Sequence, residues 1–213
     1  MNIGRLPHPT PDELSADQRA VYDEIVGGPR GSGPFPLTDD EGRLHGPFNA
    51  MLVHPGVGLS LQRLGADIRY RSALEARERE LAILAVARLR DSDFEWYAHE
   101  RAGLAAGLTP GELDALDRGA TPDTLGDRER TVLLVTRALV VDRDLGDATF
   151  ADAARTLGLA VLADLVTLVG YYDLLALSLR IWRVPLPSGH SRRPGPGPTG
   201  GGTAPEGPPG SAR

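Results

Sequence analysis

The chain has 213 residues, 41% of them hydrophobic, and a formal net charge of −6 at pH 7. This length and apolar content suit one ordinary domain with a packed core. All 23 basic residues are arginine and there is no cysteine, which excludes a Schiff-base lysine, a P-loop lysine and a disulfide framework, and an acidic chain without a basic stripe is not typical of nucleic-acid binding.

The predicted location is the cytoplasm. Residues 1–14 contain no apolar stretch like that of a signal peptide, and a chain without cysteine fits a reducing compartment. Residues 157–182 are long and apolar, but Asp164 and Asp173 interrupt them, and carboxylates are costly inside a bilayer. We therefore expect a core or subunit-interface helix there, and no membrane contact.

Helical patterns follow one another along the chain, and no stretch shows sustained alternation of apolar and polar residues. Capping boxes at Thr10 and Ser15 predict a first helix that ends near residue 27. The later helices are expected at 49–53, 55–70, 75–90, 94–106, from 109, at 127–141, 148–157 and 161–182. The predicted fold class is therefore all-α.

Two regions are predicted from composition. Residues 1–187 form one helical domain, whereas residues 188–213 consist mainly of glycine, proline and small polar residues, and we expect that tail to be disordered.

Three proton-handling side chains lie within residues 80–99. Ser92 is a good N-cap and Glu95 follows it by three, so a helix should begin near residue 93 with His99 one turn beyond Glu95. A turn at 90–92 would fold this helix back along the preceding one and bring Glu80 toward the other two. Two carboxylates and an imidazole suit proton transfer, and they could equally bind a metal.

The surrounding motifs resemble a known family. RERELAILAVARL, then EWYAHE and AAGLT, are similar to the carboxymuconolactone decarboxylase family, whose fold is shared with the alkylhydroperoxidase AhpD, and the resemblance spans residues 46–187. In the redox members of this family a glutamate is followed, after eleven residues, by Cys-x-x-Cys and, after three more residues, by a histidine. In this chain these positions are Glu80, Ser92, Glu95 and His99. Without thiols a dithiol peroxidase reaction is excluded, which indicates the acid–base branch.

The resemblance implies a decarboxylase-like carbon–carbon lyase with an AhpD-like fold. Its catalytic residues would be His99 as general acid/base, Glu80 as its partner and Glu95 as a proton relay or substrate contact. We expect no cofactor, a small unsaturated or cyclic carboxylic acid or lactone as substrate, and a homo-oligomer, a trimer or a multiple of one. An isomerase, a lactone hydrolase, a cyclase or a non-catalytic ligand-binding oligomer remain alternatives.

Five further residues are predicted to bind the substrate. His45, Phe48 and Asn49 belong to or adjoin the segment GPFNAML, which also resembles the family and should border the pocket. Trp96 could line the pocket, although an aromatic residue is more often a packing residue. Arg69 could pair with a substrate carboxylate, with a surface ion pair as the alternative.

A sequence pattern recurs at a spacing of 51 residues. Leu-x-x-Arg-Glu-Arg occurs at 74–79 and 125–130, and Gly-Leu occurs at 107–108 and 158–159. A constant spacing over both parts predicts a duplicated helical hairpin. The polar cluster is not duplicated, because the positions equivalent to Glu80, Ser92, Glu95 and His99 are Thr131, Arg143, Gly146 and Phe150. We therefore expect the cluster to serve more than the fold, and Phe150 to be a core residue.

Overall fold

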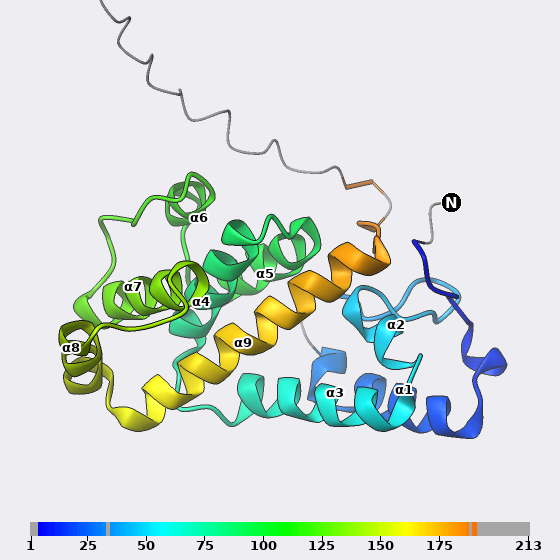
Figure 1. Cartoon of the computed structure of the whole chain (residues 1–213). Coiled ribbons are helices and arrows are strands. Elements are labelled where there is room, and N and C mark those ends of the chain that lie inside the picture. Colours follow the sequence, from blue (N-terminus) through cyan, green and yellow to red (C-terminus); the bar gives the residue numbers. More distant parts are fainter. Residues whose placement is uncertain (1–3, 33–34, 188, 191–213) are drawn as a thin grey trace, which may run out of the picture.

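The computed structural model describes residues 4–32, 35–187 and 189–190 (Figure 1). Within those residues the fold is all-α, as predicted, and no β-strand occurs. The helices are η1 (Pro11–Glu13), α1 (Ala16–Gly27), η2 (Pro29–Ser32), α2 (Pro47–Met51), α3 (Pro55–Tyr70), α4 (Ala76–Leu89), α5 (Asp93–Ala105), α6 (Pro110–Asp117), α7 (Asp127–Val141), α8 (Asp147–Leu157) and α9 (Leu159–Trp182).

Helices α4 and α9 form the centre of the molecule. Figure 1 shows α9 running diagonally between α1–α3 on one side and α4–α8 on the other. Every residue from Glu80 to Ala87 in α4 is buried, because this helix is apolar on nearly all sides and is covered by α5, α7 and α9. The cluster at residues 80–99 therefore begins in the most enclosed helix of the fold.

Helix α9 is long and apolar enough to cross a membrane by length and composition alone. Half of its most apolar window is nevertheless buried inside the fold, where it packs against α2, α3, α4, α7 and α8. Leu165 and Leu168 are completely enclosed, which is typical of a core helix.

The duplicated hairpin is confirmed by α4–α5 and α7–α8. Arg77 of the first copy donates to Glu129 of the second at 2.5 Å, and Arg128 of the second donates to Glu78 of the first at 2.7 Å. Each arginine thus binds the glutamate that follows the other arginine. Reciprocal contacts of this kind are the signature of a two-fold relation between two similar units.

Phe150 is not a core residue, and the prediction was wrong. Its exposed fraction is 47%, because α8 is an outer helix that buries only Ala153 and Leu157, toward its C-terminal end. Phe150 lies one turn earlier, where α8 presents it to the surface.

The predicted tail at 188–213 lies outside the described residues except for 189–190. His190 there packs its ring on Tyr97 at a centroid distance of 4.3 Å.

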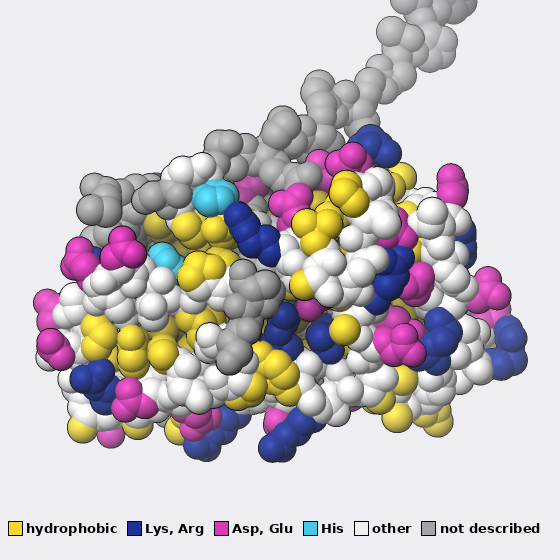
Figure 2. Space-filling view, turned by 180° about the vertical axis from the view of Figure 1, so that it is seen from behind, with side chains coloured by type: hydrophobic (Ala, Val, Ile, Leu, Met, Phe, Trp, Pro, Cys, Tyr) yellow, Lys and Arg dark blue, Asp and Glu magenta, His cyan; other side chains and the backbone are white. Residues whose placement is uncertain are grey.

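Figure 2 views the molecule from the side opposite to Figure 1 and shows hydrophobic side chains gathered over the N-terminal helices, on the left, and more arginine and acidic side chains over the other half.

Candidate active site

Glu80 and His99 form a buried hydrogen-bonded pair. Glu80 Oε2 lies 2.7 Å from His99 Nδ1, and only 1% of the Glu80 side chain is exposed. The pair forms because the chain turns back after α4, with Asp91 in the left-handed region at φ 52° and the Ser92 amide donating to the Ala87 carbonyl. This turn aligns α5 with α4 and places His99 beside Glu80, as predicted.

Cations surround the Glu80 carboxylate. Its Oε1 lies 3.2 Å from Arg69 Nη1 and 3.6 Å from Arg79 Nε. Burial opposes ionisation of Glu80, but His99 and the two arginines outweigh it and lower the pKa of this carboxyl. Glu80 is therefore a carboxylate at neutral pH, and a carboxylate can only accept hydrogen bonds.

His99 must consequently carry its proton on Nδ1, because Glu80 needs a donor there. Burial lowers the pKa of His99 below its usual 6.5, although Glu80 opposes this shift. The ring is thus neutral at pH 7, and Nε2 is its unprotonated nitrogen. Tyr172 packs edge-on against the ring at 5.1 Å and fixes its plane. The arrangement presents a base at Nε2.

Glu95 is a buried carboxyl without a hydrogen-bond partner among the described residues. The predicted capping box is absent, since the Ser92 side chain makes no cap hydrogen bond. Burial raises the pKa of Glu95 to about 8, assisted by the charge of Asp173, and the nearby Ser92 hydroxyl opposes this only in part. Glu95 therefore carries a proton at neutral pH and can act as an acid.

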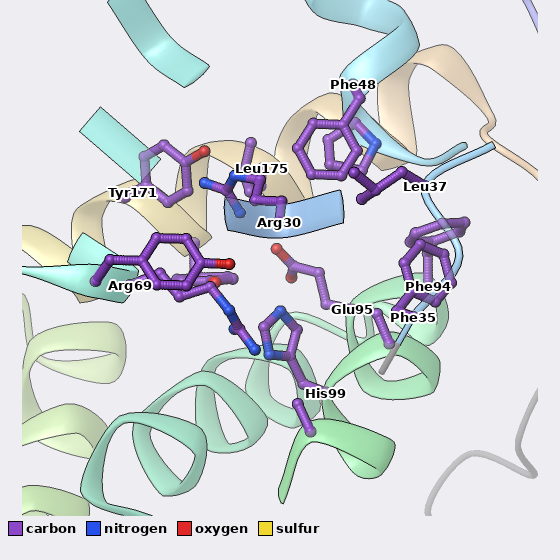
Figure 3. A pocket seen from close by; sticks show the side chains of 15 residues that line it. Arg30, Phe35, Leu37, Phe48, Arg69, Phe94, Glu95, His99, Tyr171 and Leu175 are labelled. Atoms are coloured by element: carbon purple, nitrogen blue, oxygen red, sulfur yellow. The ribbon is translucent and has the colours of Figure 1, made fainter. Parts of the chain in front are cut away.

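Glu95 and His99 both face a cavity of about 90 Å³, which is enough for several water molecules or part of a small ligand. In Figure 3 the two side chains project into the space between Arg30 and Arg69. Most of the wall is aromatic or aliphatic. The lining residues are Arg30, Phe35, Leu37, Pro47, Phe48, Arg69, Tyr70, Phe94, Glu95, Ala98, His99, Ala102, Tyr171, Tyr172 and Leu175.

Five of the eight residues predicted for the site lie together. Glu95, His99, Phe48 and Arg69 line the cavity, and Glu80 lies behind them in contact with His99 and Arg69. Arg69 does not form the surface pair considered from the sequence, because its guanidinium is directed to Glu80.

The other three predicted residues do not line this cavity. Trp96 is 3% exposed and packs with Leu81 and Leu84 in the core. Asn49 and His45 line a separate hollow near the N-terminal segment. The Asn49 side-chain amide donates to the Pro7 carbonyl at 2.8 Å, which holds it there.

The sequence did not identify several cavity residues. Arg30 and Phe35 come from the segment between α1 and α2, and Tyr171 and Tyr172 come from α9. Two signals pointed to them. A glycine- and proline-rich connection as long as residues 27–49 is usually functional when it is ordered, and paired tyrosines interrupt an otherwise aliphatic helix.

Metal binding was an open alternative for the Glu80, Glu95 and His99 cluster. Within the described ranges, no group of three acidic or histidine side chains is close enough to hold a metal ion. The two guanidinium groups on Glu80 would also repel a cation at that carboxylate. The donor set fits proton transfer better than metal coordination.

Comparison with known proteins identifies related sequences and folds. Residues 55–138 match the model of the carboxymuconolactone decarboxylase family. This segment contains Glu80, Glu95 and His99, and it excludes Arg30 and both cavity tyrosines of α9. No curated protein sequence matches the chain significantly.

Solved structures share the fold at low identity. An AhpD-core, peroxidase-related protein from Ralstonia eutropha JMP134 has a TM-score of 0.70 and 16% identity, covering 87% of this chain and 93% of its own. A peroxidase-related protein from Silicibacter sp. TM1040 has a TM-score of 0.66 and 14% identity, and the match covers 87% of this chain and 92% of that protein. The debrominase Bmp8, solved with 2,3,4-tribromopyrrole, has a TM-score of 0.66 and 12% identity, and the match covers 88% of this chain and 92% of that protein. These likenesses establish the AhpD-like fold.

Proposed function

We propose that this chain, whose residues 55–138 match the model of the carboxymuconolactone decarboxylase family, is a cofactor-independent acid–base enzyme. Its substrate is a small unsaturated or cyclic carboxylic acid or lactone, and its reaction is a decarboxylase-like cleavage of a carbon–carbon bond. The observation that carries this proposal is the Glu80–His99 hydrogen bond of 2.7 Å, with His99 and the buried Glu95 facing the same cavity.

The chemistry requires few groups from the protein. Loss of CO₂ breaks the bond to the carboxyl carbon and leaves its electron pair on the neighbouring carbon, where a conjugated carbonyl delocalises it. A proton must then form the new C–H bond, and Glu95 carries one at neutral pH. His99 Nε2 is the complementary base, and Glu80 stabilises the imidazolium when it forms. The apolar wall limits water around these groups, which strengthens their electrostatic interactions.

Thiol chemistry gives no competing function for this chain. Two structural neighbours are named peroxidase-related, but a chain without cysteine cannot form a thiolate or a disulfide. The complex of Bmp8 with a small halogenated ring supports a ligand of similar size here. It does not favour debromination for this chain.

A direct test measures CO₂ release and deuterium incorporation when unsaturated and cyclic carboxylic acids are incubated with the protein in D₂O. For an acid that is turned over, His99→Gln should lower the rate by about 10²–10⁴, the usual contribution of a general acid or base. His54→Asn is the matched control, because His54 is an exposed histidine that only caps α3 and asparagine is also a good N-cap. Full turnover by a folded His99→Gln variant would contradict the proposal.

We also propose that the protein is a homo-oligomer. Large apolar side chains are exposed along α9, at Val166, Leu174, Leu177 and Ile181. Their spacing places them on one outer side of the helix. A continuous apolar stripe of this kind is more typical of a protein–protein contact than of a free surface, and identical subunits most often assemble with closed symmetry.

A further inference from the structure

Arg30 brings a cation to the cavity from outside the family segment. It lies in η2, at Pro29–Ser32, whereas the family match covers residues 55–138. Its guanidinium carbon is 5.4 Å from the centre of the Phe48 ring, and Figure 3 shows the guanidinium beside the Tyr171 hydroxyl, facing the same space as Glu95. The segment between α1 and α2 therefore contributes a positive charge to a mostly apolar site.

The hydrogen-bonding capacity of Arg30 is only partly used. Arg30 Nε donates to Gln62 Oε1 at 3.4 Å. Gln62 is neutral and 4% exposed, and its own amide group donates to Glu24 at 3.3 Å. Arg30 Nη2 is buried, and although the Tyr171 hydroxyl interacts with the Arg30 guanidinium, Nη2 has no hydrogen bond of regular geometry to any described residue. A buried guanidinium donor without an acceptor is costly, so a ligand that supplies one would be bound favourably.

Arg69, the other arginine on the cavity, differs in this respect. It is paired with the Glu80 carboxylate at 3.2 Å, so its guanidinium already has a carboxylate partner within the protein. Arg30 forms no ion pair with any described residue, and Glu95 across the cavity is neutral because its pKa is raised to about 8. A negative charge is therefore missing beside Arg30 and not beside Arg69.

The backbone leaves room for this guanidinium. Gly65 in α3 faces Arg30 and Tyr171, and a Cβ atom at this position would lie 2.7 Å from Arg30 Nη2 and 2.1 Å from the Tyr171 hydroxyl oxygen. Any larger residue at position 65 would displace both groups. Gly65, Gln62 and Phe48 together hold Arg30 in one place without giving it a counter-charge.

We propose that Arg30 is the specificity-determining anchor for a carboxylate of the substrate, and that the cavity selects small planar carboxylates whose ring or double bond lies against the aromatic wall. This inference deepens the proposed function and rests on it. A guanidinium and a carboxylate match in geometry and can form two parallel hydrogen bonds. Binding there holds the rest of the ligand toward Glu95 and His99, which line the same small cavity.

The experiment uses benzoate as the probe and benzamide as its neutral analogue, with binding to the full chain measured by calorimetry and by ligand-detected NMR. The wild-type protein should bind benzoate at least tenfold more tightly than benzamide. Arg30→Gln should weaken benzoate binding at least tenfold and leave benzamide binding unchanged. The benzoate affinity of Arg30→Lys should lie between those of the wild type and Arg30→Gln, because lysine keeps the positive charge but cannot form two parallel hydrogen bonds to a carboxylate. Arg155→Gln is the control, since Arg155 is 74% exposed and pairs with Asp152 on α8, away from the cavity.

The outcomes separate this inference from the acid–base proposal. His99→Gln should keep at least a tenfold preference for benzoate over benzamide, because the anchor for the carboxylate is a separate residue. Equal binding of benzoate and benzamide by the wild-type protein, or unchanged benzoate binding in a folded Arg30→Gln variant, would overturn the inference. So would a loss of benzoate binding in Arg69→Gln that Arg30→Gln does not share. None of these results would alter the turnover test on His99.

Discussion

Glu95 and His99 lie one turn apart on α5, and burial shifts their pKa values in opposite directions. The pKa of Glu95 is raised to about 8, whereas that of His99 is lowered from its usual 6.5. Between these two values the carboxyl holds a proton and the imidazole does not. At pH 7 the carboxyl of Glu95 is therefore protonated, unlike an ordinary glutamate, beside a neutral imidazole, which is the pattern of an acid and a base prepared for one reaction.

The first prediction concerns the pH profile of kcat/KM for any acid that the enzyme turns over. Activity should rise with pH through the lowered pKa of His99, because the base must lose its proton. It should fall again near pH 8, where Glu95 loses the proton that makes it an acid. Stopped assays between pH 5 and 10 would measure this. A rate that stays constant from pH 7 to 10 would contradict the role of Glu95.

The second prediction needs no substrate and compares wild type with Glu95→Gln. An unfolded glutamate loses its proton near pH 4.5, whereas folded Glu95 keeps it to about pH 8. Between these values the folded state binds more protons, so Glu95 makes the wild type less stable as pH rises, by up to about 1.4 kcal/mol per pH unit. Glutamine cannot ionise, so the stability of Glu95→Gln lacks this dependence on pH.

Urea unfolding at pH 5, 6, 7 and 8 would test it. The stability of wild type minus that of Glu95→Gln should decrease steadily across this range, because the other carboxyl groups are common to both proteins and cancel. A difference that does not change with pH would show that Glu95 titrates normally.

The third prediction concerns the effect of Glu80 on His99. Glu80 is a negative charge 2.7 Å from His99 Nδ1 and favours the imidazolium, so Glu80→Gln should lower the pKa of His99 further. Nitrogen-15 NMR of the imidazole would give both the pKa and the tautomer, with the proton on Nδ1 in the wild type. Asp67→Asn is the control, because Asp67 is 56% exposed and pairs with Arg71 at the surface. An unchanged His99 pKa in Glu80→Gln would contradict the coupling.

Local sequence patterns predicted most of the helices and the contact between Glu80 and His99. The helix expected at 55–70 is α3, at Pro55–Tyr70, and the one expected at 94–106 is α5, at Asp93–Ala105. Helix α2 was expected at 49–53 but begins earlier, at Pro47, because proline suits the first helical position. Glu80 and His99 could be paired because a single short turn joins their helices.

Contacts between distant segments could not be predicted in the same way. Arg30 and Tyr171 meet over Gly65 only because η2, α3 and α9 pack together, and no periodicity in the chain encodes that packing. The error at Phe150 has a related cause, since a duplicated sequence predicts a similar helix but not the neighbours that cover it. Trp96 shows the limit of a motif, because its side chain points into the core and not into the cavity.

The fourth prediction concerns the two reciprocal ion pairs between the hairpins. Arg77 binds the carboxylates of Glu112 and Glu129 and is 25% exposed, whereas Arg128 binds the carboxylate of Glu78 and the Thr156 carbonyl and is 41% exposed. Arg77→Met leaves two carboxylates without their cation and should cost about 3–5 kcal/mol. Arg128→Met should cost less, because water already reaches that arginine. Urea unfolding of both variants would measure this, and equal losses would show that the second carboxylate on Arg77 adds nothing.

The last prediction concerns assembly through α9. The resemblance to the family implies a trimer or a multiple of one, and the apolar stripe on α9 gives a surface for it. Leu174 is 47% exposed and Leu177 is 61% exposed. Replacing both with glutamate would put charges in an apolar contact, where they cannot be solvated. Light scattering at micromolar concentration should then report a smaller species than for the wild type.

Val57→Glu is the matched control, because Val57 is 63% exposed but lies on α3, and it should leave the assembly unchanged. A wild-type protein that is already monomeric would contradict the oligomer, and a double variant that assembles normally would move the contact away from α9.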